Sequence, residues 1–244
     1  LAARFPATAE LALCAIIVAS ICGIALGVLA AVKKNKLADN ASMVLALIGV
    51  SMPVFWSGIL LILLFSAPLH ILPSSGRVTP LLQPTGGTGF FIFDTIAKGD
   101  FEALGDVLVH LVLPTVTLSL YSMAIITRMT RSSMLETLNA DYIRTARAKG
   151  LAKRSVNVKH ALRNAILPVV TYLGPALAYT LTGSLIVEKI FTIPGLGDSF
   201  VSSITGRDYM VIMGTTIFLA TLIITMNVIV DIVYKIIDPR IKLK

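Results

Sequence analysis

Few residues of this chain could do chemistry, and their spacing does not fit catalysis. The glycine-rich run at 85–89 (TGGTG) lacks the G-x-x-x-x-G-K-[ST] spacing of a phosphate-binding loop, and that pattern occurs nowhere in the 244 residues. His70 and His110 lack metal-ligand spacing; we interpret them as interfacial histidines, with nickel ligation as the alternative. No Ser/His/Asp or Cys/His arrangement suggests a nucleophile. We therefore expect that the chain is not an enzyme and that it has no catalytic residue, cofactor or metal site.

Three other reactive or charged residues lie within apolar segments. Cys14 and Cys22 are interpreted as small apolar helix residues that need no redox role. Asp231 precedes Lys235 by four positions, and an i,i+4 ion pair explains its presence in an apolar run. An acid inside a membrane span is also a functional candidate, so proton coupling through Asp231 stays open.

The composition is that of a membrane protein. Hydrophobic residues make up 56% of the chain and charged residues 14%, against roughly 25% charged in soluble domains. A helix of about 20 residues crosses the hydrocarbon core, and five uncharged runs reach that length. These runs are residues 11–32, 41–67, 107–127, 164–187 and 209–230. We therefore expect an all-α integral membrane protein with five spans.

The positions of the basic residues predict the orientation. Sixteen of the 21 Lys and Arg residues follow the first, third or fifth run, and such residues stay on the cytoplasmic side. The net charge of +8 therefore indicates membrane topology and not nucleic-acid binding. The start of the chain is expected outside and its end in the cytoplasm. Without an initiator methionine or a cleavable signal, this predicts one further span ahead of residue 1.

Glycines and prolines mark the runs as packed and interrupted helices. Gly23 and Gly27 form a G-x-x-x-G stripe that favours a tight helix–helix seam, either within the subunit or between copies. Pro53 is expected to kink the second run, and Pro168 and Pro175 to interrupt the fourth. Interrupted helices are common where transporters hold or gate a solute.

Residues 128–163 form a strongly basic segment between the third and fourth runs, with nine bases and only two acids, Glu136 and Asp141. We expect a short helix capped by Asn139 or Asp141, a left-handed turn at Gly150, and a second helical stretch over 153–164. The small residues Ala146, Ala148 and Gly150 would let this segment enter a groove on another protein. On composition alone, a solvated loop on anionic lipid headgroups is the favoured interpretation.

These residues resemble a known family. Residues 141–151 read DYIRTARAKGL, 160–165 read HALRNA and 167–171 read LPVVT, which is similar to the cytoplasmic signature of binding-protein-dependent ABC importer permeases. Further similar motifs lie along the chain at 4–8, 51–56, 73–77, 128–134, 191–197, 207–209 and 238–241. The wider superfamily has E-A-A before the glycine and a proline thirteen residues after it. Arg144-Thr145-Ala146 and Arg163 stand there instead, as in the B-type subunit of the dipeptide/oligopeptide/nickel group.

The resemblance implies one type I ABC importer transmembrane domain over residues 1–244, in a bacterial inner membrane, with a coupling segment at 128–163. It implies a second homologous permease subunit, two cytoplasmic ATPase subunits that hydrolyse the ATP, and a solute-binding protein that docks on external segments 68–106 and 188–208. The residues expected to contact the ATPase are Arg144, Thr145, Ala146, Arg147, Ala148, Lys149, Gly150 and Leu151. Di- or oligopeptides are the expected solute, with nickel or glutathione as alternatives. An ion-coupled secondary transporter is the alternative from another class.

Overall fold

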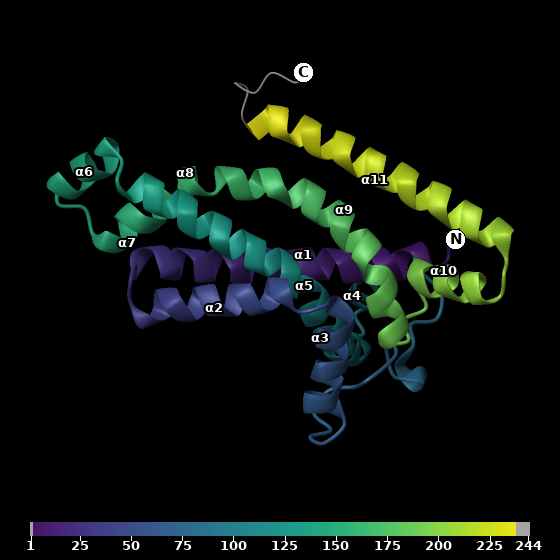
Figure 1. Cartoon of the computed structure of the whole chain (residues 1–244). Helices are drawn as coiled ribbons and strands as arrows, with labels where there is room; N and C mark the ends of the chain where they lie inside the picture. Colours follow the sequence, from purple (N-terminus) through teal and green to yellow (C-terminus); the bar gives the residue numbers. More distant parts are fainter. Residues whose placement is uncertain (1, 238–244) are drawn as a thin grey trace. The chain divides into compact units, whose positions relative to one another are not determined.

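The structure is a computed structural model that describes residues 2–237, and it is built of helices (Figure 1). The four longest are α1 (Phe5–Val32), α5 (Phe101–Leu138), α9 (Leu167–Ile190) and α11 (Tyr209–Ile237). Shorter elements lie between them: α2 (Leu37–Ser51), α3 (Val54–Leu61), η1 (Ile62–Ser66), η2 (Pro80–Leu82), α4 (Phe91–Lys98), α6 (Asp141–Ala148), α7 (Lys153–Ser155), η3 (Val156–Leu162), α8 (Arg163–Ala165) and α10 (Leu196–Thr205).

Among the described residues, four helices are long and apolar enough to cross a membrane, namely α1, α5, α9 and α11. The broken pair of α2 and α3–η1 adds a fifth when it is counted as one span. The sequence prediction of an all-α protein with five spans is therefore confirmed in element type and number. The side chains of Asp231 and Lys235, and the motif at 238–241, lie outside the described part.

The prolines act differently from one another. Met52 and Pro53 are both extended, with ψ of 127° and 136°, so the second run is two separate helices and not one kinked helix. The fourth run is interrupted at Ile166, between α8 and α9 and two residues before Pro168, as predicted. The interruption predicted at Pro175 is wrong, because α9 passes through Pro175 without a break. Pro168 is the second residue of α9, where a backbone N–H would have no helical partner in any case.

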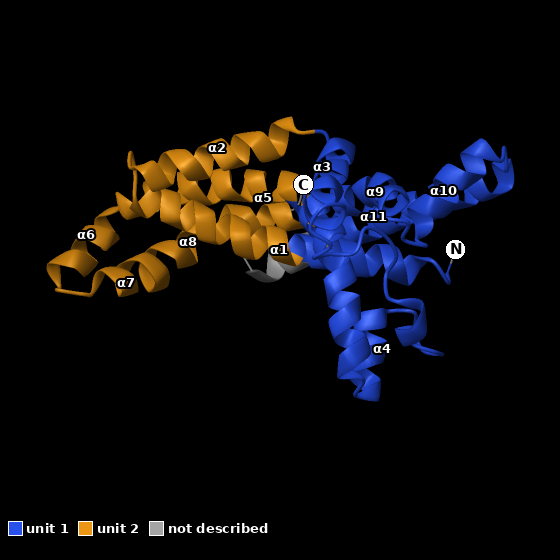
Figure 2. Cartoon of the chain, turned by 90° about the horizontal axis from the view of Figure 1, so that it is seen from below, with its two compact units in different colours: residues 1–16, 53–119, 177–244 blue, residues 17–52, 120–176 orange. Residues whose placement is uncertain are grey.

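The chain divides into two compact units (Figure 2). Unit 1 contains residues 1–16, 53–119 and 177–244, and unit 2 contains residues 17–52 and 120–176. The core of unit 1 gathers around Phe191, Leu11 and Val107, all nearly or completely buried. In unit 2 the predicted glycine seam forms within the chain, where α1 packs on α5. A Cβ at Gly23 would lie 2.8 Å from Ile126 Cγ2, and one at Gly27 would lie 2.7 Å from the carbonyl oxygen of Thr127.

In unit 1, segment 68–106 is held by polar contacts. Arg77 Nη2 donates to Glu10 Oε2 at 2.6 Å, and both side chains are buried. The Arg77 guanidinium also lies 3.8 Å from the centroid of the Phe91 ring, and the amide of Ile92 donates to Glu10 Oε1 at 2.7 Å. Because these contacts join α1, the loop and α4, the loop is ordered as well as rich in turns.

Candidate functional site

The short helix α6 is the central element of the basic segment. It begins after extended Ala140, whose ψ is 150°, so neither Asn139 nor Asp141 caps it and that prediction is wrong. Asp141 occupies the first turn, where a carboxylate favours the positive end of the helix dipole. Its Oδ1 also lies 3.5 Å from Arg144 Nη1, and both side chains are largely exposed. Asp141 therefore supports the helix electrostatically from within its first turn.

The turn after α6 agrees with the prediction. Gly150 has φ of 75°, in the left-handed region that side chains other than glycine rarely adopt. Its amide donates to the carbonyl oxygen of Arg147 at 3.0 Å. The chain then continues as α7, η3 and α8, so the second helical stretch is also confirmed. Tyr142 joins the two stretches, because its hydroxyl accepts a 2.8 Å hydrogen bond from Asn164 Nδ2.

One face of α6 packs on its own protein. Ile143 is completely buried and Ala146 nearly so, in a cluster with Met134 of α5 and Ala31 of α1. Val156, Ala161 and Ala165 complete that cluster. The Ala146 side chain is therefore covered by its own protein, and its entry into a groove on another protein stays a prediction. Ala148 and Gly150 remain exposed.

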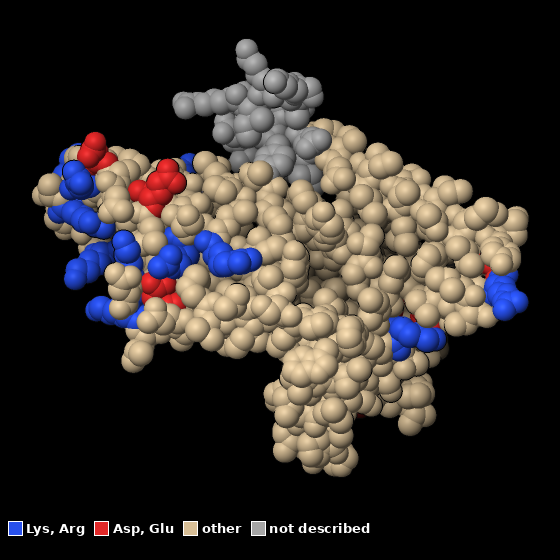
Figure 3. All heavy atoms as spheres, in the orientation of Figure 1, with Lys and Arg blue, Asp and Glu red and all other residues tan. Residues whose placement is uncertain are grey.

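The other face of α6 and the turn after it are open. The exposed residues are Arg144, Thr145, Arg147, Ala148, Lys149, Gly150 and Leu151, which are seven of the eight expected contact residues. Thr145 Oγ1 donates to the carbonyl oxygen of Asp141 at 3.1 Å, so its side chain is tied to its own helix. Lys and Arg side chains gather over the end of unit 2 that carries α6 and α7, where acids are fewer (Figure 3). The exposed face is therefore basic.

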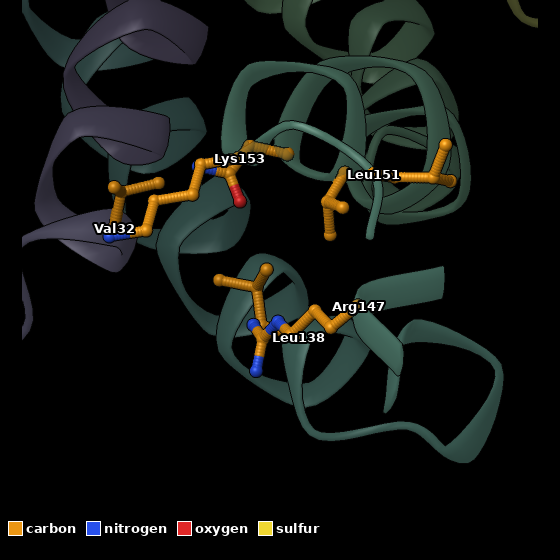
Figure 4. Close-up of a pocket in the computed structure, with 7 residues that line it drawn as sticks. Val32, Leu138, Arg147, Leu151 and Lys153 are labelled. Atoms are coloured by element: carbon orange, nitrogen blue, oxygen red, sulfur yellow. The ribbon is translucent and has the colours of Figure 1, made fainter. Parts of the chain in front are cut away.

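A hollow of about 440 Å³ lies beside α6 (Figure 4). Its lining comes from the ends of α1 and α5 and from the coupling segment. The residues are Val32, Leu138, Arg147, Leu151, Lys153, Val156 and Asn157.

An ion pair that sequence reasoning missed fixes the base of this segment. Arg131 of α5 donates from Nε to Asp39 Oδ1 at 2.6 Å and from Nη2 to Oδ2 at 2.8 Å. Asp39 is 3% exposed and also accepts from the amide of Asn35 at 2.9 Å. The pair joins the start of α2 to α5 one turn before Met134, which contacts α6. The only sequence signal was an acid in the first turn of a helix.

In unit 1, both histidines of the nickel alternative line one hollow of about 470 Å³, together with Asp106. His110 Nδ1 lies 2.9 Å from the carbonyl oxygen of Asp106, and the Asp106 carboxylate accepts from the amide and hydroxyl of Thr79. Within the described part of the chain, no three His, Cys, Asp or Glu residues are placed to hold a metal ion.

Comparison with known proteins gives the same picture along the whole chain. The dipeptide transport system permease protein DppB of Escherichia coli strain K12 is 46% identical over 244 residues, covering 99% of this chain and 72% of that protein. DppB of Bacillus subtilis strain 168 is 46% identical over 98% of this chain and 68% of that protein. The di/tripeptide permease DppB of Pseudomonas aeruginosa strain UCBPP-PA14 is 44% identical, with 98% and 71% covered.

A solved structure shares the fold. The crystal structure of an amino acid ABC transporter with histidines aligns with a TM-score of 0.63 at 13% identity, covering 95% of this chain and 91% of that one. Residues 23–243 match the family described as the binding-protein-dependent transport system inner membrane component. The helices, the basic segment and these relatives agree: the chain belongs to this family of multi-pass inner-membrane permeases.

Proposed function

We propose that this chain is one of two permease subunits of an ATP-driven importer that carries di- or oligopeptides into the cytoplasm. The observation that carries the proposal is the 46% identity to a dipeptide permease over 244 residues. Similarity of that extent covers the helices that would form the pathway as well as the coupling segment. A homologous permease pairs with this chain, and an extracytoplasmic binding protein delivers the peptide to segments 68–106 and 188–208.

The contact with the ATPase is assigned to residues 144–151. Two cytoplasmic ATPase subunits hydrolyse ATP, and one of them covers the exposed face of α6. The basic, exposed character of this face supports the assignment. The packing of α6 also supports the assignment. Because Ile143 and Ala146 pack on α1 and α5, a displacement of α6 would also move those helices. In this arrangement the basic segment and the C-terminus lie in the cytoplasm.

Reconstitution tests the proposal. The purified complex of both permeases and both ATPases is placed in liposomes with its binding protein, and uptake of a labelled dipeptide is measured. We expect uptake that requires ATP and the binding protein and stops with a non-hydrolysable ATP analogue. Labelled nickel and glutathione are offered in parallel vesicles, and preferential uptake of either would replace the peptide assignment. Uptake that follows an ion gradient without ATP would contradict the importer proposal.

A further inference from the structure

The hollow beside α6 differs from the exposed helix face in being concave. Its apolar lining comes from three elements, with Val32 at the end of α1, Leu138 at the end of α5 and Val156 in η3. Leu151, in the turn after α6, adds a fourth apolar side chain and is 42% exposed. Figure 4 shows the labelled side chains of these separate segments arranged around one space. The hollow is therefore a built concavity within unit 2.

The charge of the lining has one sign. Arg147 and Lys153 are cations and Asn157 adds a neutral amide, while none of the described residues that line the hollow is acidic. Both cations are exposed, and in the described part of the chain neither has an ion-pair partner. A carboxylate or phosphate in the hollow could accept a charge-assisted hydrogen bond from either cation. The hollow thus fits a ligand that combines a negative charge with an apolar portion.

The packing of α6 leaves its exposed face and the adjoining concavity open to a partner. Because Ile143 and Ala146 are buried against α1 and α5, α6 cannot enter a groove with its whole circumference. A partner that covers the exposed face meets the adjoining surface as well. Arg147 and Leu151 belong both to the proposed contact at 144–151 and to the lining of the hollow. A protein seated on α6 at residues 144–151 therefore contacts two residues that line the hollow.

On the basis of the function proposed above, we propose that the hollow receives an acidic side chain and an adjacent apolar side chain from the ATPase subunit. The carboxylate lies between Arg147 and Lys153, and the apolar side chain packs on Leu138, Leu151 and Val156. Pockets of about 300–1,000 Å³ enclose a drug-sized molecule, so a hollow of about 440 Å³ has room for two side chains. The contact is then reciprocal: the permease offers a helix face and also takes in residues of its partner.

Lys153 gives the sharpest test, because it lines the hollow but lies outside residues 144–151. The complex of both permeases in nanodiscs of neutral lipid is titrated with the ATPase, and the dissociation constant is measured. We expect Arg147→Gln and Lys153→Gln each to weaken binding about tenfold or more, a loss typical of a desolvated charge pair. Arg154→Gln is the matched control, since it removes the same charge from the next, exposed position and should change binding less than about twofold.

Two further variants probe the shape and the partner. Val32→Trp keeps both cations but fills part of the hollow, and it should also weaken binding. Lys153→Glu should be rescued by an acid-to-lysine substitution at one position of the ATPase, which would identify the inserted residue. If Lys153→Gln and Val32→Trp both bind the ATPase as tightly as Arg154→Gln does, no ATPase side chain enters the hollow.

The remaining outcomes separate this inference from the proposed function. If only Arg147→Gln weakens ATPase binding, the hollow does not receive the ATPase side chains, but the contact at 144–151 still stands. Failure of the unmodified permease to bind the ATPase contradicts the proposed function itself. A third outcome is that the lining variants bind the ATPase normally but lose anionic phospholipid in native mass spectrometry. The hollow would then be a lipid headgroup site, and the proposal that it receives side chains of the ATPase would be wrong.

Discussion

Asp39 and Arg131, separated by 92 positions in the sequence, form a two-pronged ion pair with distances of 2.6 and 2.8 Å. Such parallel bonds fix the relative orientation of the two side chains as well as their distance. The pair holds the start of α2 on α5 beside Met134, and Met134 in turn packs on α6. Within unit 2, the ion pair and the packing around Met134 therefore connect the ends of α1, α2 and α5 with the buried face of α6.

Breaking this ion pair should destabilise the permease. Asp39→Asn or Arg131→Gln leaves one partner without its counter-charge, which costs about 3 kcal/mol for a mostly buried pair. Chemical unfolding in detergent micelles measures the loss. The double variant Asp39→Asn/Arg131→Met should recover much of the stability, because it leaves no unpaired charge. The exposed pair of Asp141 and Arg144 provides the control, and Asp141→Asn should lower the stability by less than about 1 kcal/mol.

Two glycine-to-alanine substitutions should change the stability in opposite directions, because only one of the two glycines lies in the seam between α1 and α5. At Gly27 a new Cβ would lie 2.5 Å from Thr130 Cβ and 2.7 Å from the backbone oxygen of Thr127, so α1 and α5 must separate. Gly27→Ala should therefore lower stability by about 1–3 kcal/mol. Gly105 of α5 has nothing within 4 Å of a new Cβ, and Gly105→Ala should raise stability by about 0.5–1 kcal/mol. Unfolding of both variants under the same conditions checks this, and equal effects would contradict a close seam.

How far the sequence predicts this fold depends on the range of the interaction. The glycine turn at Gly150 was predictable because a left-handed backbone is a local property. The uncharged runs also located the spans, since hydropathy depends only on the residues of each run. The partner of Arg131 was not predictable, because no local signal identifies Asp39 among the acids of the chain. The buried face of α6 could have been predicted from the sequence, because Ile143 and Ala146 are three positions apart and so lie on one face of the helix.

Arg77 should control the order of segment 68–106. Arg77→Gln removes the buried partner of Glu10 and the cation over Phe91. We expect faster hydrogen exchange at the amide of Ile92, which donates to Glu10. Lys98→Gln is the control, because Lys98 bonds only to the exposed carbonyls of Thr85 and Gly86 in the described structure. Unchanged exchange at Ile92 in Arg77→Gln would mean that the ion pair does not order α4.

Acid should loosen the loop that precedes α4. Burial disfavours ionisation of Asp94, but the hydrogen bonds it accepts from Thr88 and from the amide of Gly89 outweigh burial and hold its pKa below the ordinary value. A lowered folded pKa means that this stabilisation is present above about pH 4 and is lost as the pH falls through the folded pKa. A spin label at exposed Thr85 should become more mobile in that range.

The control for the acid effect is Asp94→Asn, which has no carboxylate to protonate. Its spin label at Thr85 should already be mobile at neutral pH and should show no further change on acidification. If the label in the unmodified loop remains equally immobile well below pH 4, Asp94 does not hold the loop.

The most direct test of the central claim, that the exposed residues of the segment 144–151 contact an ATPase subunit, is a cysteine cross-link. Cys14 and Cys22 are both free, so each is first replaced by alanine. Ala148→Cys is then paired with single cysteines along the surface of the ATPase in membranes, with and without ATP. Ala148 is exposed, whereas Ala146 is nearly buried, so Ala146→Cys serves as the control. We expect a cross-link at Ala148 whose yield changes with ATP and none at Ala146. No cross-link from Ala148 at any ATPase position, with both proteins assembled, would contradict it.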